Sequence, residues 1–561
     1  MQSFRKAPAF RKMLGLSLGV ALTSLAAAGA VQATDKSMQL IASDPVQTSA
    51  GRIAGTALPS GVKAYLGIPF AEAPVGDLRW APPRAAHWSG IFNADRKGAE
   101  CMQVLRPHDI NHYFGEEATG EDCLTLNLWA PREAKAGAKL PVIIFIYGGG
   151  FTIGSSGMAN YDGEAMAKAG ALFVNFNYRV GALGFLAHPE LTKEQQGASG
   201  NYGLMDQTLA LQWVRDNIAQ FGGDPDKVVI MGQSAGAGSV AAQIVSPPAR
   251  GLFRAAVMSS GCNLRAPKAT LADAEKIGLA FQERLGAKSL AEMRLIPADR
   301  ILAAQSESQL GLSVSGVRLN GPIVDGRVLP KQAADAVASG DFAKVPMIAS
   351  FNEDDMAFGF EALTGARTVA DYRAGAEKLF GADAAAFLKL YPVRNDAEVR
   401  GQARRAAQDA NLAAGARACA ADTAAQGVPV YIDEYARRHP YIPGVKLADQ
   451  DIATVGAYHT ADIPYWFGTQ DAYNSLRPTR QWTAWDRTLS KQMMDALIAL
   501  ANTGSPDTAA MPWKPWSATN DTLLWLGDKV EVVKMNQTGQ AWLAGHRPVM
   551  TGQPRLSRPR D

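Results

Sequence analysis

This sequence contains few cysteines and histidines, and its net charge is small. It has four cysteines and seven histidines among 561 residues, and its formal net charge is only +3. The cysteine spacing matches no zinc-binding motif, so no metal site is expected. A nearly neutral chain without basic stripes has no electrostatic footprint for nucleic acid, and no apolar run of 18 residues follows the N-terminal segment. Small molecules are therefore the expected partners.

The first 33 residues have the composition of an export signal. Four basic residues precede an apolar run at residues 13–30, and small residues place a cleavage site after Ala30 or Ala33. A transmembrane anchor is the competing interpretation, but Gly, Ser and Ala dilute the run. Cleavage would lower the formal net charge from +3 to −1, because the segment holds four basic and no acidic residues. We predict a signal peptide at 1–33 and an exported protein, periplasmic or secreted, with no membrane span after its removal.

Export makes disulfides the expected state of the cysteines, since their number is even and the destination is oxidising. Cys101 and Cys123 enclose 21 residues rich in Gly, Glu, Asp and His. Such a stretch has little core of its own, so a cross-link there would stabilise it. Cys262 and Cys419 pair only by elimination.

From residue 141 onward, short apolar runs alternate with segments of helical periodicity. Strands are predicted at residues 142–147, 172–176, 228–231, 345–348 and 428–432. Between the second and third of these, apolar residues recur at helical spacing across residues 203–221. Strands buried on both faces with helices between them predict an α/β fold with a mostly parallel central sheet flanked by helices.

Two long segments between the predicted strands are interpreted as helical insertions over the sheet. Residues 263–320 and 357–425 are rich in Ala, Leu, Lys and Glu, and no internal repeat is found. We therefore predict a single domain at residues 34–545. Residues 546–561 are a basic tail that contains prolines.

Residues 232–236, with the sequence GQSAG, fit the pattern G-x-S-x-G. The pattern alone arises by chance in roughly a quarter of chains of this length, but its surroundings are specific. A predicted strand ends just before it, and small residues at 235–242 suit a helix just after it. In such a turn the glycines lift the serine hydroxyl clear of the sheet, beside a helix N-terminus that favours negative charge. Ser234 is thus the candidate nucleophile; the alternative is an ordinary surface serine.

A serine that transfers acyl groups also needs donors for the developing oxyanion. The segment YGGGF at 147–151 directly follows a predicted strand. Its glycines let backbone N–H groups approach a substrate closely, although a merely flexible loop is the alternative. We assign the oxyanion donors to Gly149, Gly150 and Ala235.

Several segments besides these two motifs carry a family resemblance. They are LGIPF at 66–70, EDCLTLN at 121–127, NYR at 177–179, GNYGLMDQ at 200–207 and IPYWFG at 463–468. With these segments, the chain resembles the type B carboxylesterase family, which includes cholinesterases, fungal lipases and bacterial para-nitrobenzyl esterases. The segments follow the order of the family, and the resemblance extends from about residue 45 to 530. The resemblance implies one catalytic domain of the α/β-hydrolase fold, a Ser-acid-His triad, and a disulfide joining Cys101 to Cys123.

The chain departs from the family pattern at two places. Gln233 stands where the family commonly has Glu, and the loop from Cys101 to Cys123 lacks the Trp on which cholinesterases stack a quaternary ammonium. A choline ester is therefore a disfavoured substrate.

A serine nucleophile needs a general base, which in this fold follows the nucleophile and the acid along the chain. That order leaves His439, His459 and His546. His546 stands at the edge of the basic tail, and His439 is predicted to lie in a solvated loop. His459, within GAYHTAD at 456–462, matches the family motif and is the predicted base.

Three neighbouring carboxylates, Glu353, Asp354 and Asp355, compete for the role of triad acid. All three follow a predicted strand, at the end where this fold builds its site. In the family pattern an Asn is followed, after one variable residue, by Asp and then the acid, which puts Asp355 first, Asp354 second and Glu353 third. Many relatives have the longer Glu at this place, so an Asp requires the loop to lie closer to His459.

The sequence therefore predicts a serine carboxylic-ester hydrolase that forms an acyl-enzyme on a small-molecule ester, without a metal or other cofactor. Two alternatives stay open. One is a lipase for longer acyl chains, whose entrance His112, Tyr113 and Phe114 would line, although that stretch is poor in apolar residues. The other is a non-catalytic binding member of the family, which is disfavoured because the nucleophile is present.

The cysteine pairing leads to a first prediction. Non-reducing peptide mapping of the exported protein should recover Cys101 linked to Cys123, and Cys262 linked to Cys419. Free thiols at positions 101 and 123 would contradict the first pairing and weaken the argument for export.

Overall fold

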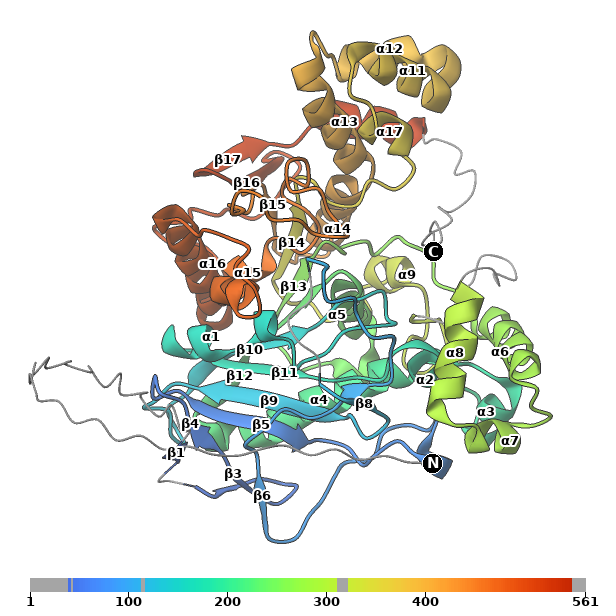
Figure 1. The fold of residues 1–561 in the computed structure, drawn as a ribbon, viewed down its shortest axis with the longest axis vertical. Helices are drawn as coiled ribbons and strands as arrows, with labels where there is room; N and C mark the ends of the chain where they lie inside the picture. The colour runs from blue at the N-terminus through green and yellow to red at the C-terminus, as the bar shows by residue number, and fades with distance from the viewer. Residues whose placement is uncertain (1–38, 42–43, 112–116, 310–320, 547–561) are drawn as a thin grey trace, which may run out of the picture. The chain divides into compact units, whose positions relative to one another are not determined.

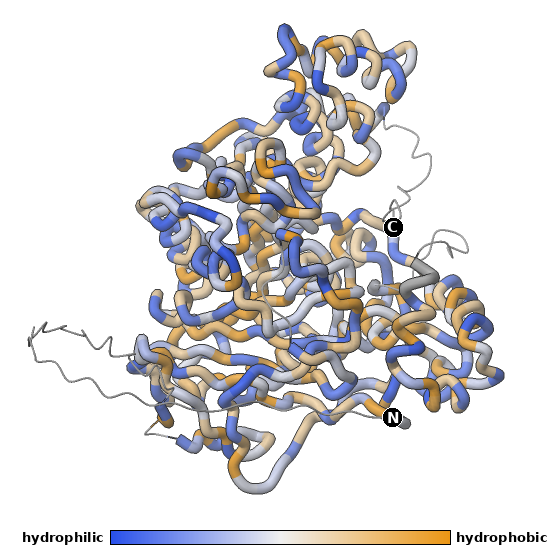
Figure 2. The backbone as a smooth tube through the Cα atoms, viewed as in Figure 1, coloured by the Kyte–Doolittle hydropathy of each residue, from blue (hydrophilic) through white to orange (hydrophobic). Residues whose placement is uncertain are grey.

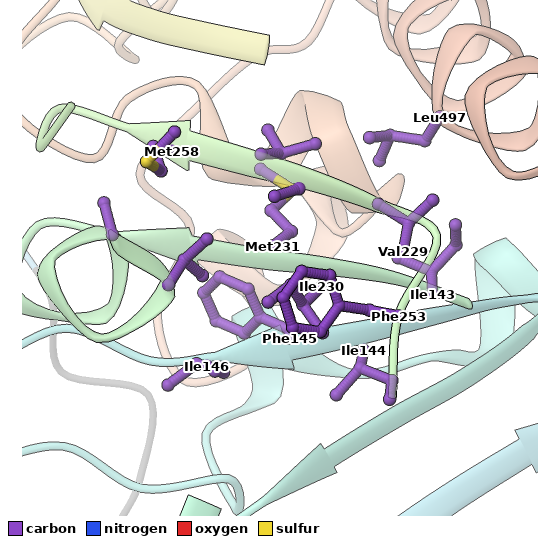
Figure 3. Close-up of a cluster of buried hydrophobic side chains, with 14 of the residues drawn as sticks. Ile143, Ile144, Phe145, Ile146, Val229, Ile230, Met231, Phe253, Met258 and Leu497 are labelled. Atoms are coloured by element: carbon purple, nitrogen blue, oxygen red, sulfur yellow. The ribbon is translucent and has the colours of Figure 1, made fainter. Parts of the chain in front are cut away.

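Short runs of Val, Ile and Phe build the centre of the main sheet. The computed structural model describes residues 39–41, 44–111, 117–309 and 321–546. Within them, β10 (Leu140–Ile146) and β12 (Gly223–Gln233) pair in parallel and bury their apolar side chains on both faces. Figure 3 shows side chains of both strands in this core, with Leu497 of α16 (Ala484–Thr503) in the same buried cluster.

The main sheet is parallel at its centre and antiparallel at both edges. Its strand order is β1-β4-β5-β9-β11-β10-β12-β13-β14-β15-β16-β17. Pairs from β11 through β16 are parallel, and those from β1 to β11 and between β16 and β17 are antiparallel. The remaining bounds are β1 Gln39–Leu40, β4 Thr56–Ala57, β5 Lys63–Pro69, β9 Thr125–Ala130, β11 Leu172–Phe176, β13 Ala255–Ser259, β14 Met347–Asn352, β15 Val430–Tyr435, β16 Thr522–Leu526 and β17 Val530–Lys534.

All five predicted strands overlap observed ones, namely β10, β11, β12, β14 and β15. The antiparallel edge strands were not predicted, because most are short or exposed on one face and carry no continuous apolar run. Strand β13 was also missed, because its sequence AAVMS suits a helix equally well. A small separate sheet joins β2 (Val46–Gln47), β3 (Arg52–Ala54) and β6 (Ile91–Asn93).

Helices pack on the sheet and in two further groups (Figure 1). The predicted helix at 203–221 is α4 (Tyr202–Asn217) followed by a short 3-10 turn. Helix α5 (Ala235–Val245) contacts β12 and β13, and α16 contacts β10 and β12. One group is α6 (Leu271–Leu285), α7 (Leu290–Leu295) and α8 (Ala298–Gln309); Figure 2 shows hydrophilic and hydrophobic stretches alternating along it.

The second group of helices has a hydrophobic core of its own. It comprises α10 (Glu361–Thr364), α11 (Val369–Phe380), α12 (Ala384–Leu390), α13 (Asp396–Ala410) and α17 (Gln537–Gly545). Phe360, Tyr372 and Phe387 are buried within this core, apart from the side chains of the sheet. Helix α14 (Leu412–Ala424) instead packs on β14 and β15.

Both predicted cysteine pairs occur within bonding distance. The sulfurs of Cys101 and Cys123 are 2.06 Å apart, and those of Cys262 and Cys419 are 2.13 Å apart. The second pair ties the segment after β13 to α14, two elements far apart in the sequence. The predicted signal peptide, residues 112–114 and nearly all of the basic tail lie outside the described residues. No helix among those that are described is long and apolar enough to span a membrane.

A buried ion pair fastens α4 to the segment after β11. The guanidinium of Arg179 donates to both carboxylate oxygens of Asp206, at 2.8 and 2.7 Å, and to the carbonyl of Ala81 at 2.9 Å. The backbone N–H of Arg179 also donates to Asp206, at 3.0 Å. Both side chains are almost fully buried. Because removal of one partner leaves the other charge buried and uncompensated, this pair is important for stability.

We predict that Asp206→Ala lowers the free energy of unfolding by about 3 to 5 kcal/mol. The exposed pair Arg215 and Asp226 provides the control, so Asp226→Ala should cost no more than about 1 kcal/mol. Urea unfolding followed by circular dichroism would measure both. Equal losses in the two variants would contradict a special contribution of the buried pair.

Candidate active site

Ser234 occupies a sharp turn between β12 and α5. Its backbone has φ 59° and ψ −123°, a conformation that is strained for a residue with a side chain. A Cβ on Gly232 would lie 2.1 Å from the carbonyl oxygen of Gly236, and one on Gly236 would lie 2.0 Å from that of Ile146. Only glycine fits at these two positions. In the described part of the chain, the Ser234 hydroxyl has no hydrogen-bond partner.

The glycine segment after β10 lies directly beside this serine. A Cβ on Gly148 would stand 2.9 Å from the Cβ of Ser234. Gly149 and Gly150 both have positive φ, 114° and 63°. Ala235 is the first residue of α5, so its N–H group points out of the helix N-terminus. Within the glycine segment, Gly148 is thus the residue whose position next to Ser234 is fixed by a contact.

The carboxyl ends of three parallel neighbours bring the polar side chains together. Ser234 follows β12, Ser260 follows β13, and Asp355 follows β14. Oδ1 of Asp355 is 2.5 Å from Nδ1 of His459, and Oδ2 accepts a hydrogen bond of 2.5 Å from the Ser260 hydroxyl. The backbone N–H of Met356 donates to the same carboxylate at 2.8 Å. The carboxylate is thus held in place on both of its oxygens.

Asp355 and His459 each shift the pKa of the other. Burial by itself raises the pKa of Asp355, but the His459 ring and the hydrogen bonds outweigh it, so that pKa lies below its ordinary value. Burial lowers the pKa of His459, but Asp355 and the nearby Asp462 outweigh it, so that pKa lies above its ordinary value. The pair therefore favours a charged carboxylate beside a ring that readily accepts a proton.

The other two candidate acids face away from the ring. Asp354 forms an ion pair with Arg404 of α13 and accepts the N–H of Ala457 at 2.7 Å. A Cβ on Gly456 would collide with this carboxylate. Glu353 lies 4.0 Å from Arg438, and burial raises its pKa. Of the three, all within the described residues, Asp355 alone contacts His459, while Asp354 holds the loop that carries the histidine.

Sequence reasoning missed a second buried carboxylate near the ring, that of Asp462. Its side chain is 2.5 Å from the Ser259 hydroxyl and 3.2 Å from the amide of Asn352. Burial, reinforced by the nearby Asp355 charge, raises its pKa. The only available signal was its position three residues after His459 in the same motif.

The prediction of a solvated loop around His439 is wrong. The ring is 5% exposed, its Nε2 is 2.8 Å from the carbonyl of Ala461, and its Nδ1 is 3.1 Å from the Tyr458 hydroxyl. It therefore braces the loop that carries His459. His546, at the end of α17, stacks on Trp542 with a ring separation of 4.2 Å. Neither of these histidines contacts Ser234.

Gln233, the residue before the nucleophile, contacts the candidate base. Its amide Nε2 is 3.1 Å from Nε2 of His459, and its side chain is buried. Within the described ranges, no cluster of three or more His, Cys, Asp or Glu side chains is arranged to bind a metal ion.

Comparison with known proteins identifies the family of this chain. A sequence profile described as "Carboxylesterase family" matches residues 42–542. The chain belongs to the carboxylesterase family. It is 37% identical over 492 residues to fumonisin B1 esterase of Sphingopyxis macrogoltabida, covering 86% of each chain. It is 30% identical to para-nitrobenzyl esterase of Bacillus subtilis (strain 168), covering 85% of this chain and 94% of the relative.

Solved structures of esterases share the fold of this carboxylesterase. A PNB esterase structure superposes with a TM-score of 0.71 at 28% identity, covering 90% of this chain and 99% of the other. A second one, described as thermophilic, gives the same values. The fold is therefore that of the α/β hydrolases, as the sequence predicted, and the protein is a carboxylic-ester hydrolase.

Proposed function

We propose that this carboxylesterase works through an acyl-enzyme on Ser234, with His459 as general base and Asp355 as the orienting acid. The observation that carries the proposal is the 2.5 Å contact between Asp355 and His459 at the sheet edge where the strained Ser234 turn also ends. A carboxylate on Nδ1 keeps the ring proton there, which makes Nε2 the nitrogen that takes the serine proton. Gly149, Gly150 and Ala235 donate to the oxyanion.

The reaction proceeds in two acyl transfers. Ser234 Oγ attacks the ester carbonyl while His459 Nε2 takes its proton, and the tetrahedral intermediate collapses as that proton passes to the leaving alcohol. Water then attacks the acyl-enzyme, His459 again serving as base. The acid is released and the Ser234 hydroxyl is restored. Asp355 stabilises the imidazolium formed in each half.

A lipase-like preference for longer acyl chains is the second candidate. Apolar side chains stand exposed just after the triad acid, with Met356 at 40% and Phe358 at 50% exposure, and Leu105 of the cysteine-linked loop is 61% exposed. An acyl chain that reached these side chains would bury apolar surface against them. We further propose that residues 34–545 act as one catalytic domain in an exported enzyme. A non-catalytic role is disfavoured because the nucleophile turn is present.

A substrate panel would decide between these preferences. It should compare para-nitrophenyl esters of increasing acyl length with a para-nitrobenzyl ester and with fumonisin B1, since relatives carry the last two in their names. Highest turnover on short acyl chains favours the esterase, and highest turnover on emulsified long chains favours the lipase.

We predict that Ser234→Ala remains folded while its ester turnover falls by about a millionfold, as expected for loss of a triad serine. Loss of covalent labelling by a fluorophosphonate should accompany it. Thermal melting of the variant is the control for folding. A variant that kept a tenth of the wild-type activity would exclude Ser234 as the nucleophile.

For the acid, we predict that Asp355→Asn lowers kcat by about ten-thousandfold, because the ring loses the carboxylate that selects its tautomer. Glu353→Gln should have little effect, since that side chain does not contact the ring. Steady-state kinetics on one para-nitrophenyl ester would measure both. Near-normal turnover in Asp355→Asn would show that another residue is the triad acid.

A further inference from the structure

The amide of Gln233 spans the space between the base and the glycine segment. At one end its Nε2 lies 3.1 Å from Nε2 of His459. At the other end its Oε1 lies 3.0 Å from the position that a Cβ on Gly148 would take. The side chain is 1% exposed, so neither end is free to turn into solvent. A side chain at position 148 would displace this amide. Glycine is therefore needed there for the Gln233 contact as well as for access to the oxyanion.

The contact involves the one lone pair that the reaction needs. Because Asp355 accepts from Nδ1 of His459, the proton of the neutral ring resides on Nδ1 and Nε2 is an acceptor. The Gln233 amide is therefore the donor of the 3.1 Å contact. The Ser234 hydroxyl has no partner in the described part of the chain. In the resting enzyme the basic nitrogen is thus held by Gln233 rather than by the nucleophile.

We propose that Gln233 is a positioning residue for His459, which holds the basic nitrogen beside Ser234 in the resting enzyme and, being uncharged, limits how strongly the ring binds a proton. The inference rests on the proposed function of Ser234 and His459. Upon substrate binding, Nε2 exchanges the amide for the serine hydroxyl. Once the ring has taken the serine proton, rotation of the amide presents Oε1 as an acceptor for Nε2–H.

The charges around the ring explain why a neutral residue matters at this position. Two carboxylates, Asp355 and Asp462, already favour the protonated ring from the loop side. Asp354, the neighbour of Asp355 in the sequence, is paired with Arg404 and accepts the N–H of Ala457 instead of contacting the ring. A carboxylate at position 233 would be a third negative charge close to the ring. A donor to the unprotonated ring has the opposite effect and favours the neutral base.

Three variants of the full-length chain test the proposal through the pH dependence of kcat/KM on para-nitrophenyl acetate. Gln233→Glu should move the midpoint of the acidic limb to higher pH by about one unit or more, since an opposite charge at contact distance favours the imidazolium. Activity should recover at higher pH, where the ring is again neutral. Gln233→Met, of similar length but without charge or donor, should lower kcat severalfold with little change in KM and shift the midpoint much less.

Gln426→Glu is the matched control, because it makes the same change on the protein surface. Its midpoint should equal that of the wild type. A Gln233→Glu variant that folds but keeps the wild-type midpoint would overturn the proposal, as would a Gln233→Met variant with unchanged kcat. If Gln233→Glu does not fold, as judged by thermal melting, the Gln233→Met result decides alone.

The test of Gln233 and the test of Ser234 as nucleophile can fail independently. A Ser234→Ala variant that kept a tenth of the wild-type activity would overturn the acyl-enzyme on Ser234 and, with it, this inference. An inactive Ser234→Ala together with an unmoved midpoint in Gln233→Glu would overturn the inference alone.

Discussion

The close contact between the turn after β12 and the end of β10 sets the geometry of the whole site. Gly236 lies so near the carbonyl of Ile146 that no Cβ fits between them, and Gly232 is packed equally tightly against Gly236. Between these two glycines, Ser234 has its strained backbone conformation. Because both strands are buried on two faces by the core, the strain is balanced by burial elsewhere in the sheet. In the proposed mechanism, the glycine segment, His459 and Asp355 act on the hydroxyl that results.

Electrostatic interactions then give similar groups near the ring different properties. Two buried carboxylates lie near one imidazole, and their pKa values shift in opposite directions: contact with the ring lowers that of Asp355, whereas burial raises that of Asp462. Asp355 therefore favours its charged form, as its proposed role of stabilising the imidazolium requires. Asp462 is bonded to Ser259 and Asn352 and braces the loop. On the opposite side of the ring stands the neutral amide of Gln233, which adds a hydrogen bond without a charge.

The centre of the fold was predictable because its signals are local. A parallel strand buried on both faces is a continuous apolar run, so β10 and β12 were identified from composition alone. Edge strands such as β4 are two residues long and owe their existence to the neighbour with which they pair. The separate core of α11, α13 and α17 was also beyond prediction, since it joins segments on either side of β15 and β16.

The sequence by itself determined the residues whose chemistry depends on the adjacent chain. Ser234 was predicted as the nucleophile from the glycines that its turn requires, and His459 as the base from its motif. Tertiary structure decided which of three adjacent carboxylates turns toward the ring, because Ser260 holds Asp355 while Arg404 and Ala457 hold Asp354. It also brought Gln233 to His459 across 226 positions. Such orientations depend on partners from other strands and helices, and no local pattern encodes them.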